Sequence, residues 1–373
     1  MLTIQQGRAL LPRDPQERTK LTMNWDLLYT LLNTVSVSGN EEANQKNAMQ
    51  YAKTFAHDRR VDAVGNAVAV VNPDAPRRVL LCGHMDEIGF RVTYIDDRGF
   101  VHVQKAGGVR PKLYLGAPMQ ILHETEAGYN KVCGVGAAND ELLKKEEMKD
   151  SDLIIDIGAS SREEAAKVVS VGDSVCADTQ VREMLNDRIT CRALDDKTGA
   201  FVILEAARLA AERGARCGIY ACTTTGEETT GRGAYFAAAN IQPECALIVD
   251  VTWASDAPDG DPAHTGEVKL GGGPVLCLSG TVNKVLNRRL EAAARAKNIP
   301  LQYEVAGGNT YTDGDTALAT GAGVPVALVS IPLRYMHSSA EVASKKDLES
   351  AAELIAEFLC QMDEAADYRP IRL

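Results

Sequence analysis

Apolar residues in the second half of the chain fall into short runs that alternate with stretches of helical spacing. The runs predict strands at 218–224, 246–251 and 324–331. The helical spacing predicts helices at 197–213, 233–239, 285–297 and 344–365. Strands that alternate with helices are typical of an α/β fold, in which ligands bind at the ends of the strands.

The first part of the chain shows the same pattern on a smaller scale. A helix is expected over 25–35. The segment Ser38-Gly39-Asn40 is expected to break the chain and to cap a second helix that runs to about Arg59. A short buried strand over 78–82 then leads into Gly83-His84.

The stretch from about Ile88 to Val181 has a different pattern, made of short strands and turns. Segments 90–95 and 100–104 flank a turn sequence, Asp-Asp-Arg-Gly, which predicts a hairpin. Other strands are expected at 120–122, 131–133 and 153–157, and a capping box over 160–163 predicts a short helix. We therefore predict an α/β domain in two pieces, 24–87 and 182–373, a β-rich domain inserted at 88–181, and an N-terminal arm at 1–23.

Composition narrows the function. The 373 residues carry a net charge of -11 and no run of Lys or Arg, which is unfavourable for nucleic acid. Apolar runs fall far short of the ~20 residues of a membrane span, and residues 1–23 lack the apolar core of a secretory signal. The nine cysteines include no C-x-x-C pair, which favours reduced thiols and a cytoplasmic location.

Acidic and imidazole side chains stand where predicted strands run out into loops. His84 and Asp86 are two apart in an extended segment and therefore face the same side, so Asp86 could hold the ring of a metal-bound His84. Four further positions follow in the same way: Asp195, the pair Glu227 and Glu228, Asp250 and His337.

Each residue taken singly also has an ordinary structural explanation. Asp195 or Asp196 could simply cap the helix that follows, and on sequence alone that is the favoured interpretation. The two glutamates could form a solvated loop, Asp250 could cap a strand end, and the histidines could be core or loop residues. Together, however, His84, Asp195, Glu228, Asp250 and His337 offer two imidazoles and three carboxylates, a set that suits zinc, cobalt or manganese better than calcium.

Two such ions can share Asp195 and activate water together, which leaves Glu227 as a general base. The sequence thus predicts a hydrolase with a two-metal centre.

The chain resembles the tetrahedral aminopeptidases, family forty-two of the metallopeptidases, which also holds proteins labelled glutamyl aminopeptidase or endoglucanase. The resemblance runs from about Leu27 to the C-terminus. It is carried by several motifs in order, at 83–90, 156–164, 193–197, 226–228, 250–252 and 334–338.

The resemblance implies a mixed-sheet α/β/α catalytic domain with a small inserted barrel-like domain for dimerisation. It places His84, Asp195 and Asp250 on one metal and Asp195, Glu228 and His337 on the other. Glu227 matches the general base and Asp86 the residue behind His84, and the Asp195–Asp196 peptide is expected to be cis. Two divalent ions per subunit, zinc first and cobalt or manganese as alternatives, peptide substrates and a homo-oligomer of dimers, up to a dodecameric tetrahedron, are further implications.

Three segments depart from the family pattern. After its Glu-Glu pair the family has Val-Gly, one variable residue and Arg-Gly-Ala, whereas here Gly231 stands one position later, in Thr229-Thr230-Gly231-Arg232. Thr312-Asp313 matches the family but the next residue does not, and 134–143 matches poorly. Three other functions stay open: a deacylase or dipeptidase with the same metals, a glycoside hydrolase and a non-catalytic assembly protein.

Overall fold

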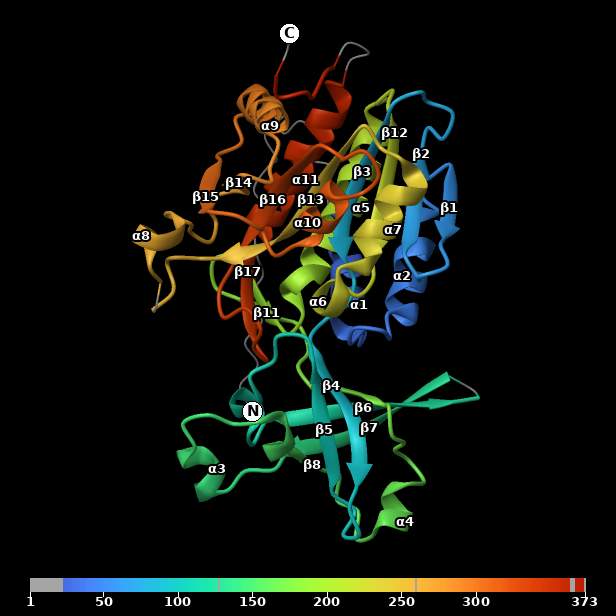
Figure 1. The fold of residues 1–373 in the computed structure, drawn as a ribbon, viewed down its shortest axis with the longest axis vertical. Coiled ribbons are helices and arrows are strands. Elements are labelled where there is room, and N and C mark those ends of the chain that lie inside the picture. Colours follow the sequence, from blue (N-terminus) through green and yellow to red (C-terminus); the bar gives the residue numbers. More distant parts are fainter. Residues whose placement is uncertain (1–22, 127, 259, 363–365, 372–373) are drawn as a thin grey trace, which may run out of the picture.

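The computed structural model describes residues 23–126, 128–258, 260–362 and 366–371. The predicted arm at 1–23 therefore lies, except for Met23, outside the described residues. The chain forms a large sheet with helices on both faces and, beyond one edge of that sheet, a separate barrel (Figure 1). This confirms the predicted class, a mixed-sheet α/β fold with a barrel-like β-rich part.

The large sheet has eight strands in the order β1-β2-β12-β3-β13-β16-β14-β15. Four neighbours in its centre, β12, β3, β13 and β16, run parallel, whereas β2 and β14 meet them antiparallel. The strands span Asp58–Val61 (β1), Ala67–Val71 (β2), Arg78–His84 (β3), Gly218–Thr224 (β12), Cys245–Trp253 (β13), Val275–Ser279 (β14), Gln302–Ala306 (β15) and Val326–Leu333 (β16). Carboxyl ends of the four central strands thus meet at one edge.

Both faces of this sheet are covered, which explains why its central strands are apolar without a break. Along β3, Val79 and Leu81 pack into one core, and Leu80 and Cys82 into the other. The first core holds α1 (Trp25–Asn33), α2 (Glu42–Ala52), α5 (Leu194–Glu212), α9 (Lys284–Lys297) and α11 (Lys345–Cys360). The second holds α7 (Arg232–Ile241) and α10 (Asp313–Leu318).

Two helix predictions are wrong at their ends. The second helix, expected to reach Arg59, ends at Ala52, and β1 begins at Asp58 because that segment pairs with β2 at the sheet edge. Its N-cap is Glu41, without a side-chain cap, although Gly39 does break the chain at a φ of 88°. The last helix, expected to reach residue 365, ends at Cys360, and 363–365 lie outside the described residues. Strands β2, β14 and β15 were not predicted.

The barrel closes in the order β4-β5-β8-β7-β6-β9, with every pair antiparallel. Its strands are Gly89–Ile95 (β4), Val101–Ala106 (β5), Pro118–Thr125 (β6), Gly128–Gly136 (β7), Ile154–Asp156 (β8) and Ser174–Ala177 (β9). The predicted hairpin is β4–β5. Short helices lie in the connections between the barrel strands: Pro111–Tyr114 (η1), Asp140–Lys144 (α3), Asp150–Asp152 (η2) and Arg162–Ala165 (α4).

The predicted capping box is one residue out of register, because Ser161 rather than Ser160 caps α4 by accepting the N–H of Glu164. The chain leaves the large sheet after β3 and returns to it at β12, so the barrel is built between two adjacent strands. The boundaries 88 and 181 stay predictions.

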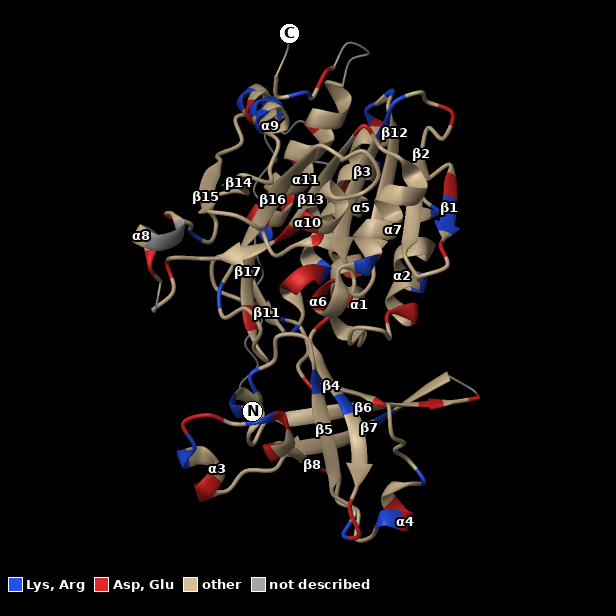
Figure 2. Cartoon of the chain, in the orientation of Figure 1, with Lys and Arg blue, Asp and Glu red and all other residues tan. Residues whose placement is uncertain are grey.

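A third, small sheet consists of β10 (Arg182–Met184), β11 (Arg188–Cys191) and β17 (Glu341–Ser344) in that order. It contacts α5 and α11 through its strand β17. Two short helices complete the fold, Glu227–Thr230 (α6) and Pro262–Thr265 (α8). Figure 2 shows the acidic α6 at the edge of the large sheet that faces the barrel. Among the described residues, no helix is long and apolar enough to cross a membrane.

Candidate metal centre

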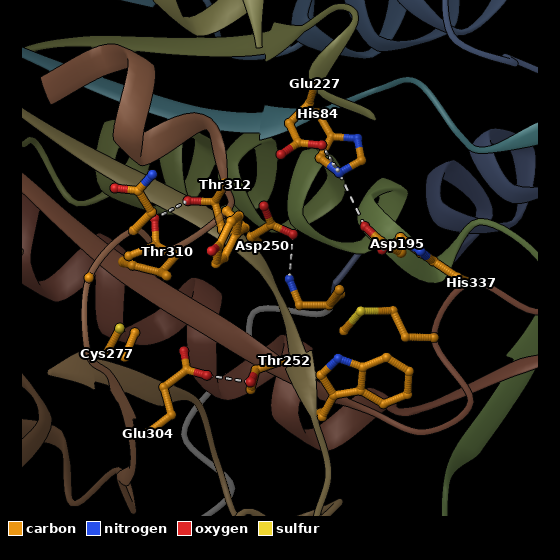
Figure 3. A pocket seen from close by; sticks show the side chains of 18 of the residues that line it. His84, Asp195, Glu227, Asp250, Thr252, Cys277, Glu304, Thr310, Thr312 and His337 are labelled. Carbon is orange, nitrogen blue, oxygen red and sulfur yellow. Dashed lines mark hydrogen bonds and ion pairs between the residues drawn. The ribbon is translucent and has the colours of Figure 1, made fainter. Parts of the chain in front are cut away.

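The seven residues singled out from the sequence lie together at the carboxyl edge of the central parallel strands (Figure 3 labels five of them). His84 ends β3, Asp250 lies near the end of β13, and His337 follows β16. Glu227 and Glu228 begin α6 just after β12. Asp195 sits at the start of α5, which packs on one face of the sheet against β3 and β13. Ligand sites at this edge are the rule in open α/β sheets.

Asp195 lies between the two histidines. Its Oδ1 is 3.1 Å from Nε2 of His84, and its Oδ2 is 3.3 Å from Nε2 of His337. Oε2 of Glu228 lies 3.7 Å from the same nitrogen of His337. One carboxylate whose two oxygens face two different imidazoles has the arrangement of a ligand shared by two ions.

Two sets of three residues could each hold a metal ion, because the potential ligand atoms within each set lie within 4.8 Å of one another. One set is His84, Asp195 and Glu228, and the other is His84, Asp196 and Asp250. The second set contains Asp196 where the family pattern has Asp195. The carboxylate of Asp196 is already engaged, because it accepts the backbone N–H of His84 at 3.1 Å and of Gly199 at 2.9 Å. We therefore regard it as a support for the backbone. The peptide between Asp195 and Asp196 is cis, as the resemblance implies.

Asp86 is fully buried and organises the glutamate pair more than the imidazole. Its two carboxylate oxygens accept the backbone N–H groups of Glu227 and Glu228, at 3.1 and 3.2 Å. The atom nearest Nδ1 of His84 is the backbone carbonyl of Asp86 at 3.0 Å, whereas the carboxylate is 3.5 Å away. The role of Asp86 is thus wider than the sequence suggested.

The carboxylates of this centre repel one another in a buried setting. Burial raises the pKa of Glu227 to about 9, and nearby Asp250 adds to the rise. Burial likewise raises the pKa of Asp250 to about 8 and that of Glu228 well above its usual value. Burial opposes the charge of His84, but hydrogen bonds to Asp195 and Asp86 outweigh it and raise the pKa of the ring well above normal. A positive charge among these carboxylates would offset their repulsion.

The residues fit divalent metal ions. Oε1 of Glu228 is buried and has no hydrogen-bond partner among the described residues, which is a costly state for a carboxylate oxygen unless it binds a cation. The mixed imidazole and carboxylate set suits a transition metal such as zinc. The prediction of a divalent metal site is therefore supported.

Two acidic residues near the centre were not counted in it from the sequence. Glu341 is buried and accepts the backbone N–H of His337 at 2.9 Å and of Asp195 at 3.2 Å, so it positions the segments of two candidate ligands. The sequence feature that could have identified Glu341 is its place four residues after His337, as the first residue of the short buried strand β17. Asp313 is buried and accepts the hydroxyl of Thr224 at the end of β12.

The shifted glycine has a structural reason. Gly231 has a φ of 62° and separates α6 from α7, so the chain requires a left-handed residue at this position. A Cβ there would lie 2.8 Å from the side chain of Thr316. The glutamate pair on α6 is unaffected by the shift.

A cleft of about 610 Å³ opens above the centre. It is lined by His84, Asp195, Glu227, Glu228, Asp250 and His337, and beyond them by residues of β13 to β16 and of the 307–312 loop. In the part of the chain that the structure describes, no Lys or Arg lines the cleft. The site can therefore hold metal ions at one end and has room for a small organic group beside them.

Comparisons with known proteins point to one family. The sequence profile of M42 glutamyl aminopeptidases matches residues 65–354. A putative aminopeptidase of Acetivibrio thermocellus is 35% identical over 343 residues, which cover 90% of this chain and 98% of the relative. A lysyl aminopeptidase of Pyrococcus furiosus is 31% identical over 358 residues, 93% and 100% of the two chains.

A solved structure has the same fold. It is the TET1 peptidase of Pyrococcus horikoshii, described as able to assemble into a tetrahedron or a large octahedral shell. It is 29% identical, with a TM-score of 0.79 over 91% of this chain and 99% of its own. The predicted metal-dependent aminopeptidase is thereby confirmed at the level of the family. Profile and relatives together show that this chain belongs to the M42 glutamyl aminopeptidase family.

Proposed function

We propose that this M42 peptidase removes N-terminal residues from peptides with two divalent metal ions, zinc first and cobalt or manganese as alternatives. The observation that carries the proposal is Asp195, whose two carboxylate oxygens face His84 and His337. His84, Asp195 and Asp250 would hold one ion, and Asp195, Glu228 and His337 the other. When bound, such ions polarise the peptide carbonyl and lower the pKa of water.

Glu227 has the position of a general base. Its Oε2 lies 3.8 Å from Nε2 of His84, and the residue lines the cleft without belonging to either group of clustered ligand atoms. Its carboxylate can take the proton of the attacking water and pass it to the leaving amine. Asp86 fixes the start of α6 through the N–H groups of Glu227 and Glu228 and so keeps base and ligand in place.

Substitution of the base tests this mechanism. Glu227→Gln should lower kcat on aminoacyl anilides by about 10²- to 10⁴-fold while the metal content stays unchanged. The matched control is Glu42→Gln, because Glu42 is a 61% exposed side chain on α2, paired only with Lys46. Full activity of the Glu227→Gln protein would refute the assignment.

The substrate class needs its own experiment. A chelator should abolish hydrolysis of aminoacyl anilides, and zinc, cobalt or manganese should restore it. Efficient hydrolysis of N-acyl amino acids with none of aminoacyl substrates would instead favour a deacylase. The names of the family and of one relative, glutamyl and lysyl, differ in the N-terminal residue, so they leave the preferred residue open.

We also propose that the chain assembles into a homo-oligomer through the barrel. The similar TET1 peptidase can assemble into a tetrahedron or a large octahedral shell, and the barrel stands out from the α/β part of the chain (Figure 1). Light scattering should give a mass that is a multiple of a dimer, up to twelve subunits. A monomer at all concentrations tested would contradict the proposal.

A further inference from the structure

The cleft above the candidate metal centre has a further acidic residue at its far end. Glu304 lies on β15, three strands along from β13, which carries Asp250, and it lines the same cleft. In Figure 3 its side chain stands beside Thr252, apart from the cluster of His84, Asp195 and His337. Nothing in the two-metal mechanism uses this carboxylate.

Glu304 is held by hydroxyl groups and not by a cation. Ser330 donates its hydroxyl to Oε1 at 2.6 Å, and Thr252 donates its hydroxyl to Oε2. No Lys, Arg or His of the described residues forms an ion pair with it. Burial raises its pKa, while the two hydroxyl donors act in the opposite direction. A partly buried carboxylate that is held in place but lacks a counter-charge is a receptor for a cation.

The rest of the cleft has the same electrostatic preference. Its lining includes five carboxylates, Asp195, Glu227, Glu228, Asp250 and Glu304, and neither Lys nor Arg. An acidic side chain of a substrate would therefore meet only like charge beyond the metals. The acidic lining thus disfavours a substrate with an N-terminal glutamate or aspartate and favours one with an N-terminal lysine or arginine.

The distance between the two acidic ends suits a long side chain. Asp250 and Thr252 are two residues apart on β13, so they face the same way at a spacing of about 7 Å. Thr252 contacts Glu304, which places the Glu304 carboxylate beyond that spacing. The four-carbon stem of lysine, or the stem of arginine, spans such a distance. Cys277, the register partner of Glu304, and Leu328 line the cleft and offer apolar contact to the stem.

We propose that Glu304 binds the side-chain cation of an N-terminal lysine or arginine and so makes this enzyme select basic N-terminal residues. The proposal rests on the aminopeptidase function proposed above and concerns only the residue that the cleft accepts. Ser330 and Thr252 position the carboxylate, and Ser330 lies beside Asp250 in the register of β16 with β13. The selecting group is thereby tied to the strands that carry the metal centre.

A comparison of substrates tests the proposal without any mutation. The metal-loaded wild-type protein should hydrolyse lysyl and arginyl anilides with a kcat/KM about ten- to a hundred-fold higher than norleucyl anilide, which has the lysine stem without its ammonium group. Glutamyl anilide should be the poorest of the four. Equal rates on lysyl and norleucyl anilides, or a preference for glutamyl anilide, would overturn the proposal. If no aminoacyl anilide is hydrolysed, the proposed function itself fails.

Substitution then assigns the effect to one residue. Glu304→Gln should lower kcat/KM for lysyl anilide by about ten- to a hundred-fold and leave norleucyl anilide within about three-fold. The matched control is Glu291→Gln. Glu291 lies on α9, outside the cleft, and accepts a hydrogen bond at 3.4 Å from the hydroxyl of Tyr303, which is the neighbour of Glu304 on β15. A uniform loss on all substrates would overturn the proposal, because it would mean that Glu304 binds the α-ammonium group or only supports the fold.

Discussion

Two buried groups of charges lie a short distance apart, and they are built on opposite principles. In the metal centre, carboxylates face one another and burial raises the pKa of Glu227, Glu228 and Asp250. Next to it, Glu87 is equally buried, but Arg192 lies 2.8 Å from one of its oxygens and Lys197 lies 2.7 Å from the other. There the two cations outweigh burial and lower the pKa of the carboxyl.

This difference separates a binding site from a structural joint. Glu87 also accepts the backbone N–H of Ser36, and Arg192 donates to the carbonyl of Ala177 at the end of the barrel strand β9. The group therefore links the barrel strand β9 to the segment after α1 and holds one carboxylate between two cations of the chain. Among the described residues, no Lys or Arg forms an ion pair with Glu227, Glu228 or Asp250, so a divalent ion would supply the positive charge that these carboxylates lack.

The largest effect on stability is expected from the structural joint. Glu87→Gln leaves Arg192 and Lys197 buried without their counter-charge, and such changes cost about 3–5 kcal/mol. We expect the melting temperature to fall by several degrees at equal protein concentration, as measured by calorimetry. The exposed substitution Glu42→Gln is the control and should leave it unchanged. A Glu87→Gln protein as stable as the wild type would mean that the charge of Glu87 does not stabilise the fold. The group around Glu87 would then not differ from the metal centre in how its charge is balanced.

The pH dependence of the metal-stripped protein should sharpen the comparison. The folded-state pKa values of Glu227, about 9, and Asp250, about 8, lie above their usual values, so the folded protein holds more protons than the unfolded chain between pH 5 and 8. Their contribution to stability is then fully present below the usual carboxyl pKa values and is lost as the pH rises through this range. Glu87, with its lowered pKa, acts in the opposite sense and loses its contribution only as the pH falls below about 4.5.

Thermal melts from pH 5 to 8 with and without metal would measure this dependence. Bound metal requires deprotonated ligands, so the loss at high pH should disappear or reverse when zinc is added. A metal-stripped protein whose stability rises steadily over the same range would contradict the raised pKa values.

The sequence predicted the four central strands of the large sheet and most of the long helices that cover them, but it missed the buried strand β2. Segment 218–224 coincides with β12, because seven apolar or small residues between turns leave little alternative. Strands β14 and β15 were not predicted because each has only five residues, and β15, at the edge of the sheet, has no fully buried position. The end of α2 escaped because the pairing of Asp58–Val61 with β2 depends on residues that are distant in the chain.

The candidate metal-centre residues could be found because most of them end a central parallel strand or follow one closely, and the carboxyl ends of these strands lie at the same edge of the sheet. The joint at Glu87 could not, since nothing local says that Lys197, 110 positions away, lies against it. Nor could the second contact of Asp86, whose acceptance of the Glu227 and Glu228 N–H groups depends on where α6 begins. Glu304 lies on a strand that was itself missed, and its exposure to the cleft is a property of four adjacent strands.

The smallest effect on stability is expected from a Glu→Gln substitution in the candidate metal centre. It is the most direct comparison, because the same chemical change is made at Glu87 in the structural joint. Glu228→Gln removes a carboxylate whose pKa is raised by burial and by Asp195 and whose Oε1 has no partner among the described residues. In the metal-stripped protein at pH 8, this substitution should therefore leave stability unchanged or raise it by about 1 kcal/mol, opposite in sign to Glu87→Gln. The same protein should bind zinc more weakly in a titration, because a ligand has been lost. A fall of several kcal/mol in the free energy of unfolding would mean that other groups of the protein already stabilise the charge of Glu228. The candidate metal centre would then be a second structural joint and not a site for ions.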